Sequence, residues 1–167
     1  MKTSSFLLIK TNTNSINLLS DILKSDCVLW AKSVYGPHQI VAYLESDTET
    51  QIVEAIENMR EKKGINEIDA RRVKVIPGDE DLKAFKLVKP INAVLLINVN
   101  YKEEKERVVT WNLRTIPGIV FARAMWGPAD IIAVVEAEDH ESMRNLICDK
   151  VKTQKGVREN STLYCFP

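Results

Sequence analysis

The sequence predicts an α+β protein made of two tandem copies of one β-α-β-β-α-β domain. The first observation is an internal repeat, because residues 34–45 recur with similar residue types at 125–136. The central glycines of this repeat, Gly36 and Gly127, lie 91 residues apart (127 − 36). The second observation is that each copy continues with a helix pattern, a glycine and a final apolar segment. A repeat of this length predicts duplicated domains and not short repeat units.

The first half of the first copy has the pattern strand, helix, strand, strand. Residues 6–10 form an apolar run that predicts a strand, and apolar residues at helical spacing then predict a helix that ends near Ser25. Residues 27–35 and 39–45 predict two more strands, because the Gly-Pro pair between them favours a tight turn. These two strands are expected to form a hairpin.

The second half of the first copy predicts a helix and a strand. Thr48 and Gln51 have the spacing of a capping box, which indicates a helix start. Gly64 is expected to end that helix, and residues 71–76 are expected to form the fourth strand. Residues 78–90 start with glycine and acidic residues, which predicts a linker.

The second copy repeats this order. Strands are predicted at residues 93–99, 118–125, 130–137 and 161–166. One helix is predicted at 101–115, and a second is capped by Asp139 and has apolar residues along one face between 143 and 151. The order is that of the ferredoxin-like fold, a four-stranded antiparallel sheet with both helices on one face. Continuous apolar runs predict strands buried on both faces, so the two ferredoxin-like βαββαβ domains are expected to pack sheet-to-sheet as a pseudo-dimeric α/β barrel. The predicted organisation is a domain at 1–77, a linker at 78–90 and a second domain at 91–167.

Composition narrows the classes of function. The chain has 23 basic and 23 acidic residues and no net charge, which disfavours direct nucleic-acid binding and leaves self-association open. Three cysteines without a Cys-x-x-Cys motif favour a reduced, cytoplasmic setting. Apolar runs are too short for a membrane span, so no membrane partner is expected.

Short motifs in the second copy fit a family pattern. Residues 127–130 (Gly-Pro-Ala-Asp) match a Gly-x-x-Asp turn between two strands, and residues 116–119 match a Pro-Gly turn. Residues 156–162 match Gly-Val-x-x-Thr-x-Thr, except that Asn160 replaces the first threonine. These motifs resemble the ligand-binding domain of the Lrp/AsnC (leucine-responsive and asparagine-responsive) transcription regulators. The first copy diverges from the pattern, because Gln39 replaces the aspartate and residues 64–70 lack both threonines.

The resemblance implies a ferredoxin-like domain that dimerises and binds a small molecule. Regulators of this family carry a helix-turn-helix before the domain, whereas here the first strand is expected within the first ten residues. Direct DNA binding is therefore not expected. The resemblance implies a stand-alone sensing or assembly module.

An amino acid ligand needs hydrogen-bond donors for its carboxylate and an acceptor for its ammonium group. A glycine turn exposes backbone N–H groups, and the nearby Asp130 can accept from an ammonium. Thr162 adds a hydroxyl, and Trp126 and Tyr35 offer amphipathic rings that can line a cleft. The predicted ligand-binding residues are Trp126, Gly127, Asp130 and Thr162, with Tyr35, Gly36 and Gln39 in the first copy.

A structural role stays open for each of these residues. Gly-Pro suits a hairpin sterically, aspartate readily binds turn backbone, and aromatic residues are common in cores and interfaces. His38 and His140 have no histidine or cysteine at metal-ligand spacing. No metal site, cofactor or catalytic residue is therefore predicted.

The function predicted from sequence is a regulatory module, not an enzyme. It is expected to bind a small molecule, an amino acid, in clefts between domains, and to act through homo-oligomer assembly or a protein partner such as a related regulator. One alternative is an enzyme of the dimeric α/β-barrel type, either an oxygenase or a tetrapyrrole-modifying enzyme. Another is a purely structural assembly partner.

Overall fold

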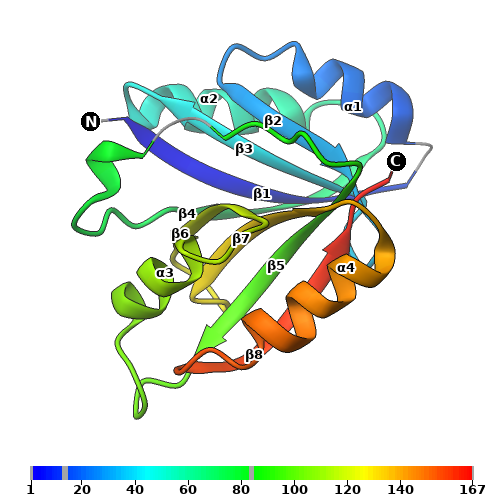
Figure 1. Cartoon of the computed structure of the whole chain (residues 1–167). Coiled ribbons are helices and arrows are strands. Elements are labelled where there is room, and N and C mark those ends of the chain that lie inside the picture. Colours follow the sequence, from blue (N-terminus) through cyan, green and yellow to red (C-terminus); the bar gives the residue numbers. More distant parts are fainter. Residues whose placement is uncertain (1, 13–14, 83–84, 167) are drawn as a thin grey trace. The chain divides into compact units, whose positions relative to one another are not determined.

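The computed structural model of the chain describes residues 2–12, 15–82 and 85–166. The chain divides into two units, of which the first ends at Val73 and also includes Phe166 (Figure 1). The second unit runs from Lys74 to Cys165, so the described residues of the predicted linker, 78–90, group with it.

The first unit contains one antiparallel sheet and two helices. Its elements are β1 (Thr3–Thr11), α1 (Ser15–Leu23), β2 (Val28–Ser33), β3 (Ile40–Ser46), α2 (Glu49–Arg60) and β4 (Ile65–Arg72). The strand order is β2-β3-β1-β4, and every pairing is antiparallel. Leu7 of β1, Ile22 of α1 and Ile52 of α2 are buried in one core cluster, which places both helices on the same face of the sheet.

The second unit repeats this architecture. Its elements are η1 (Asp79–Asp81), β5 (Ile91–Val99), α3 (Glu106–Arg114), β6 (Ile119–Ala124), β7 (Ile131–Ala137), α4 (His140–Asn145), the π-helical turn η2 (Leu146–Val151) and β8 (Val157–Tyr164). The strand order is β6-β7-β5-β8, again antiparallel. Every residue of β7 is buried, as its apolar run predicts. The prediction of an α+β fold with two ferredoxin-like repeats is confirmed.

Both edge strands that end a unit were misplaced by the sequence patterns. β4 spans Ile65–Arg72 instead of 71–76, and β8 spans Val157–Tyr164 instead of 161–166. Each strand pairs on one side only, with β1 and β5 respectively. Edge strands carry charged and polar residues that prevent pairing with other chains. A search for apolar runs therefore detects only part of each edge strand.

Helix starts depend on local side chains. Thr48 Oγ1 accepts from Gln51 N–H at 3.3 Å and Gln51 Oε1 accepts from Thr48 N–H at 3.3 Å, which is the predicted capping box. α3 starts at Glu106 and not at Tyr101, because the preceding residues form a turn in which Lys102 N–H donates to the Asn100 side chain at 3.1 Å. This turn places Tyr101 beside the end of β5.

Gly156 marks a close approach between β8 and α3. Its φ of +91° lies in the left-handed region, and a Cβ there would lie 2.6 Å from Val109 and 2.8 Å from Glu104. A side chain at this position would therefore push the start of β8 away from the helix. Among the helices of the described residues, none is long and apolar enough to cross a bilayer.

Candidate functional site

The turn between β6 and β7 contains Trp126, Gly127 and Asp130. Met125 N–H donates to the Asp130 carbonyl at 2.9 Å, and Asp130 N–H donates to the Ile97 carbonyl of β5 at 2.9 Å. Gly127 has a φ of +128°, which a residue with a Cβ adopts only with strain. The turn therefore fixes Asp130 beside the end of β5.

The Asp130 carboxylate binds two donors of its own chain. Its Oδ2 accepts from Val99 N–H at 2.8 Å, and its Oδ1 accepts from the Tyr101 hydroxyl at 2.8 Å. The Val99 contact satisfies a backbone donor where β5 ends. The Tyr101 contact comes from a residue that is 60% exposed, so water or a ligand can reach it.

The Tyr101 phenol is held in its neutral form. Burial is the first cause that raises its pKa above the usual 10.0, followed by the hydrogen bond to Asp130 and by the charge of Glu106. A neutral phenol remains a hydrogen-bond donor to Asp130 throughout the physiological pH range.

Lys74 and Glu106 lie beside the exposed ring of Trp126. The ammonium nitrogen of Lys74 lies 3.0 Å and 3.2 Å from the two carboxylate oxygens of Glu106. The same nitrogen lies 4.1 Å from the centroid of the Trp126 ring, a cation–π distance. The Lys74 and Glu106 side chains are only 22% and 16% exposed, so the pair is shielded from solvent more than a typical surface ion pair.

These contacts define the turn cluster, which consists of Lys74, Tyr101, Glu106, Trp126 and Asp130. It contains two carboxylates and two aromatic rings within one unit. Carboxylates and aromatic faces are the groups that bind organic ammonium ions. The turn cluster therefore has the chemistry of a site for an ammonium-bearing molecule.

The equivalent turn of the first unit, between β2 and β3, is built with a neutral side chain. Gln39 Oε1 accepts from Thr11 N–H at 2.8 Å, where β1 ends. Gly36 has a φ of +133°, and the exposed Tyr35 ring stacks on Phe166 with centroids 4.1 Å apart. Gln39 thus satisfies a strand-end backbone donor as Asp130 does.

His38 lies in a charged part of the first unit. Burial first, and the Lys10 charge second, lower the pKa of His38 below its usual 6.5, which favours the neutral imidazole. Lys10 pairs with Glu67 at 3.5 Å, and Arg71 pairs with Asp69 at 2.9 Å.

The structure does not bring Thr162 to the turn cluster. Thr162 of β8 lies opposite Leu95 of β5, whereas the Asp130 carboxylate binds Val99, four positions further along β5. Leu95 belongs to the core cluster beneath the helices, so Thr162 lies on the helix side of the sheet.

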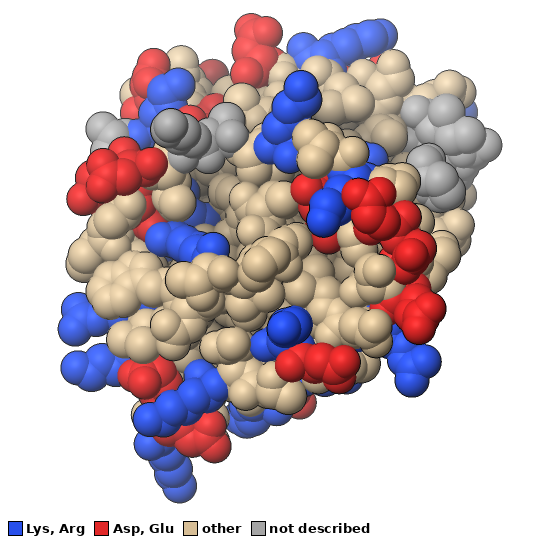
Figure 2. All heavy atoms as spheres, in the orientation of Figure 1, with Lys and Arg blue, Asp and Glu red and all other residues tan. Residues whose placement is uncertain are grey.

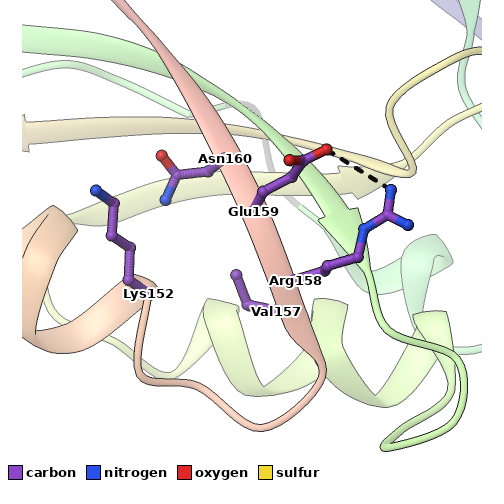
Figure 3. Close-up of a pocket in the computed structure, with 5 residues that line it drawn as sticks. All are labelled: Lys152, Val157, Arg158, Glu159 and Asn160. Atoms are coloured by element: carbon purple, nitrogen blue, oxygen red, sulfur yellow. Dashed lines mark ion pairs between the residues drawn. The ribbon is translucent and has the colours of Figure 1, made fainter.

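Beside β8 lies a pocket of about 290 Å³. It is lined by Lys152, Val157, Arg158, Glu159 and Asn160 (Figure 3). Lys152 and Asn160 lie on one side of the strand, and Arg158 and Glu159 lie on the other, where they form an ion pair of 3.6 Å (Figure 3). Within the described part of the chain, the buried Asn160 Nδ2 has no hydrogen-bond partner. The residue that departs from the family pattern therefore brings a donor to this pocket.

The sequence patterns missed Lys74, Tyr101 and Glu106. Glu106 belongs to a run of alternating charges, 102–107, which predicted a solvated helix face without a function. Lys74 lies 32 positions before Glu106, within a segment predicted as a strand, and only the tertiary structure brings the two together. No spacing rule connects these residues to the turn.

A family model matches the second unit alone, whereas solved structures match the whole chain or a large part of it. No curated protein sequence matches this chain significantly. The family model of the Lrp/AsnC ligand binding domain matches residues 92–166, which confirms the resemblance seen in the second copy. The second copy thus matches a family of small-molecule-binding domains.

Two solved structures share the fold at low sequence identity, and a third is a weaker match. The siroheme decarboxylase NirDL has a TM-score of 0.69 at 10% identity, over 99% of this chain and 72% of its own. Chlorite dismutase from Candidatus Nitrospira defluvii, in complex with imidazole, has a TM-score of 0.62 at 10% identity, over 99% of this chain and 91% of its own. The transcriptional regulator NMB0573 from Neisseria meningitidis, in complex with L-Met, has a TM-score of 0.43 at 9% identity, over 72% of this chain and 71% of its own.

The prediction that the protein is not an enzyme is contradicted by these neighbours. Two enzymes share the fold over 99% of this chain, so the fold is one that supports catalysis. The reason for the error is that a fold does not determine function. At these identities the likeness establishes the fold alone, and the chemistry has to come from the residues of this chain.

Proposed function

We propose that the protein is a regulatory module of the Lrp/AsnC type that binds an amino acid at the turn cluster of its second unit. The observation that carries the proposal is the match of residues 92–166 to a ligand-binding domain. In this chain the Gly-x-x-Asp turn of that domain belongs to a cluster with two carboxylates and two aromatic rings. The predicted residues Trp126, Gly127 and Asp130 belong to this site. Tyr35, Gly36 and Gln39 are proposed as the weaker equivalent in the first unit.

The ammonium group of the ligand would bind Asp130. The Oδ1 atom of Asp130 now accepts from Tyr101, whose side chain is exposed and can turn away, whereas Oδ2 stays on the Val99 N–H. A charged ammonium forms a stronger hydrogen bond with a carboxylate than a neutral phenol does. The backbone N–H groups of the glycine turn are proposed to bind the ligand carboxylate.

The proposed output is a change of assembly. A ligand shifts an equilibrium between two states only by the difference in its affinity for them. Acidic and basic side chains both occur on the face seen in Figure 2. The chain carries no net charge, which supports association between copies. The partner is proposed to be a second copy of the chain or a related regulator.

A thermal-shift and calorimetry screen with the twenty amino acids tests the proposal. One amino acid, at a hundredfold excess over its Kd, is expected to raise Tm by about 5 °C or more. Asp130→Asn keeps an oxygen for Val99 N–H but removes the charge, so it is expected to abolish this shift. Asp149→Asn makes the same change of charge at an exposed aspartate of the same unit, outside the turn cluster, and is expected to keep it. Equal shifts in both variants would contradict the site, and no shift in the native protein would contradict the function.

A second candidate is a tetrapyrrole-binding enzyme. It is supported by the fold shared with a siroheme decarboxylase over 99% of this chain and by His38, whose lowered pKa favours the neutral imidazole that can ligate iron. Titration with haemin would test this candidate through a shifted Soret band. The candidate requires that His38→Ala abolishes the shift and that His140→Ala, the variant of the other histidine, retains it.

A further inference from the structure

The ammonium group of Lys74 already occupies a cation site in the second unit. Its nitrogen has the Glu106 carboxylate at 3.0 Å and the Trp126 ring at 4.1 Å. Trp126 is 61% exposed, so one side of its ring borders solvent. The charge of Glu106 also raises the pKa of the Tyr101 phenol, and Tyr101 donates to Asp130, so Tyr101 links this position to Asp130.

We propose that Trp126 and Glu106 form an alkylammonium subsite, and that Lys74 is an internal competitor that fills it until a ligand displaces it. This inference rests on the proposed function, because Asp130 would bind one end of the ligand and the subsite would bind the other end. The ligand class is a small molecule with a primary ammonium on an alkyl chain, such as a basic amino acid.

The backbone keeps Lys74 close to the subsite. Lys74 N–H donates to the Ala124 carbonyl of β6 at 2.8 Å, which fixes the start of the lysine side chain near Trp126. A tethered group has a high effective concentration, so a free ligand has to compete with it. The apparent affinity for the ligand is then the intrinsic affinity multiplied by the fraction of molecules in which the subsite is empty.

The occupied state also keeps the charge of Glu106 satisfied. A carboxylate that is 16% exposed would lose stability without a partner, and Lys74 supplies the partner in the absence of ligand. An incoming ammonium provides the same charge, so Glu106 stays paired when Lys74 leaves. The exchange therefore conserves the ion pair of Glu106 and releases the lysine side chain.

The test compares three proteins: the native chain, Lys74→Met and the control Lys150→Met. Methionine keeps an unbranched chain of similar length but has no charge, and Lys150 is an exposed lysine of the same unit. The probes are n-butylammonium chloride and its uncharged counterpart 1-butanol. Binding is measured by calorimetry and by the NMR shift of the Trp126 indole N–H, assigned with Trp126→Phe.

Lys74→Met is expected to bind n-butylammonium about tenfold more tightly than the native chain and Lys150→Met, with no binding of 1-butanol. Equal affinities in all three proteins would overturn the internal competitor. Absence of binding to Lys74→Met would overturn the subsite, and if this variant fails to fold, Lys74→Gln replaces it in the same comparison.

The two proposals fail in different ways. If Lys74→Met binds n-butylammonium but no amino acid stabilises the native chain, the subsite stands and the proposed function fails. If an amino acid binds the native chain through Asp130 and Lys74→Met leaves n-butylammonium binding unchanged, the proposed function stands and the internal competitor fails.

Discussion

The hairpin turns of the two units perform the same backbone task with different side chains. Gln39 accepts from Thr11 N–H at 2.8 Å, and Asp130 accepts from Val99 N–H at 2.8 Å. In both turns the acceptor satisfies a donor where the first strand of the unit ends. Since a neutral amide suffices in the first unit, the negative charge of Asp130 is not required by the turn. Its second oxygen binds the exposed Tyr101 and is therefore the atom of Asp130 that we propose to bind a ligand.

The second unit also contains a buried ion-pair network in the segment predicted as a linker. Asp79 lies 2.6 Å from Arg114 and 3.3 Å from Arg123, and its side chain is only 2% exposed. Its Oδ2 also accepts from Ile76 N–H at 2.9 Å. In addition, Trp111 Nε1 donates to the Pro77 carbonyl at 3.0 Å. Residues 76–79 are thus fixed to the second unit by polar contacts.

The largest effect is expected for the Asp79 network. Asp79→Asn removes the charge between two arginines that are 17% and 10% exposed, and is expected to cost about 3 kcal/mol. Urea unfolding, followed by circular dichroism, measures this loss. Glu49→Gln is the control, because the Arg72–Glu49 pair is more than half exposed on both sides and is expected to contribute less than about 0.5 kcal/mol. Equal costs would contradict a fixed segment in the second unit.

A smaller effect is expected when each turn loses its acceptor. Asp130→Ala leaves the Val99 N–H without its partner and removes a charge-assisted bond, so it is expected to cost about 2 kcal/mol. Gln39→Ala removes one neutral bond to Thr11 and is expected to cost about 1 kcal/mol. The two variants are compared by urea unfolding at pH 7. A cost of Gln39→Ala that exceeds that of Asp130→Ala would reverse the ranking of the turns.

The smallest effect concerns the phenol that only the second turn has. Tyr101→Phe removes the hydrogen bond to Asp130 and is expected to cost about 0.5 kcal/mol at neutral pH. Because the pKa of Tyr101 is raised in the folded state, its stabilisation is fully present below pH 10.0 and is lost as the pH rises further. The difference in unfolding free energy between the native chain and Tyr101→Phe should therefore shrink above that pH. Tyr35→Phe serves as the control, and a difference that grows with pH would contradict the assigned hydrogen bond.

Sequence reasoning succeeded where a pattern is local. The apolar run of β7, the Thr48 capping box and the glycine turns all depend on neighbours within a few positions, so the fold and the location of the second turn were predictable. It failed for β4 and β8, because edge strands do not show a continuous apolar run. It also placed Thr162 in the site, although the strand register puts it opposite Leu95.

The sequence by itself determined that one fold occurs twice, since repeats and helix or strand periodicity are properties of the chain order. It also singled out the turn at Asp130. Only the tertiary structure decided which charges meet there, because Lys74 and Glu106 lie 32 positions apart in the sequence and form their ion pair only when the unit is folded. Contacts of this kind depend on how strands and helices pack, and no local spacing specifies them.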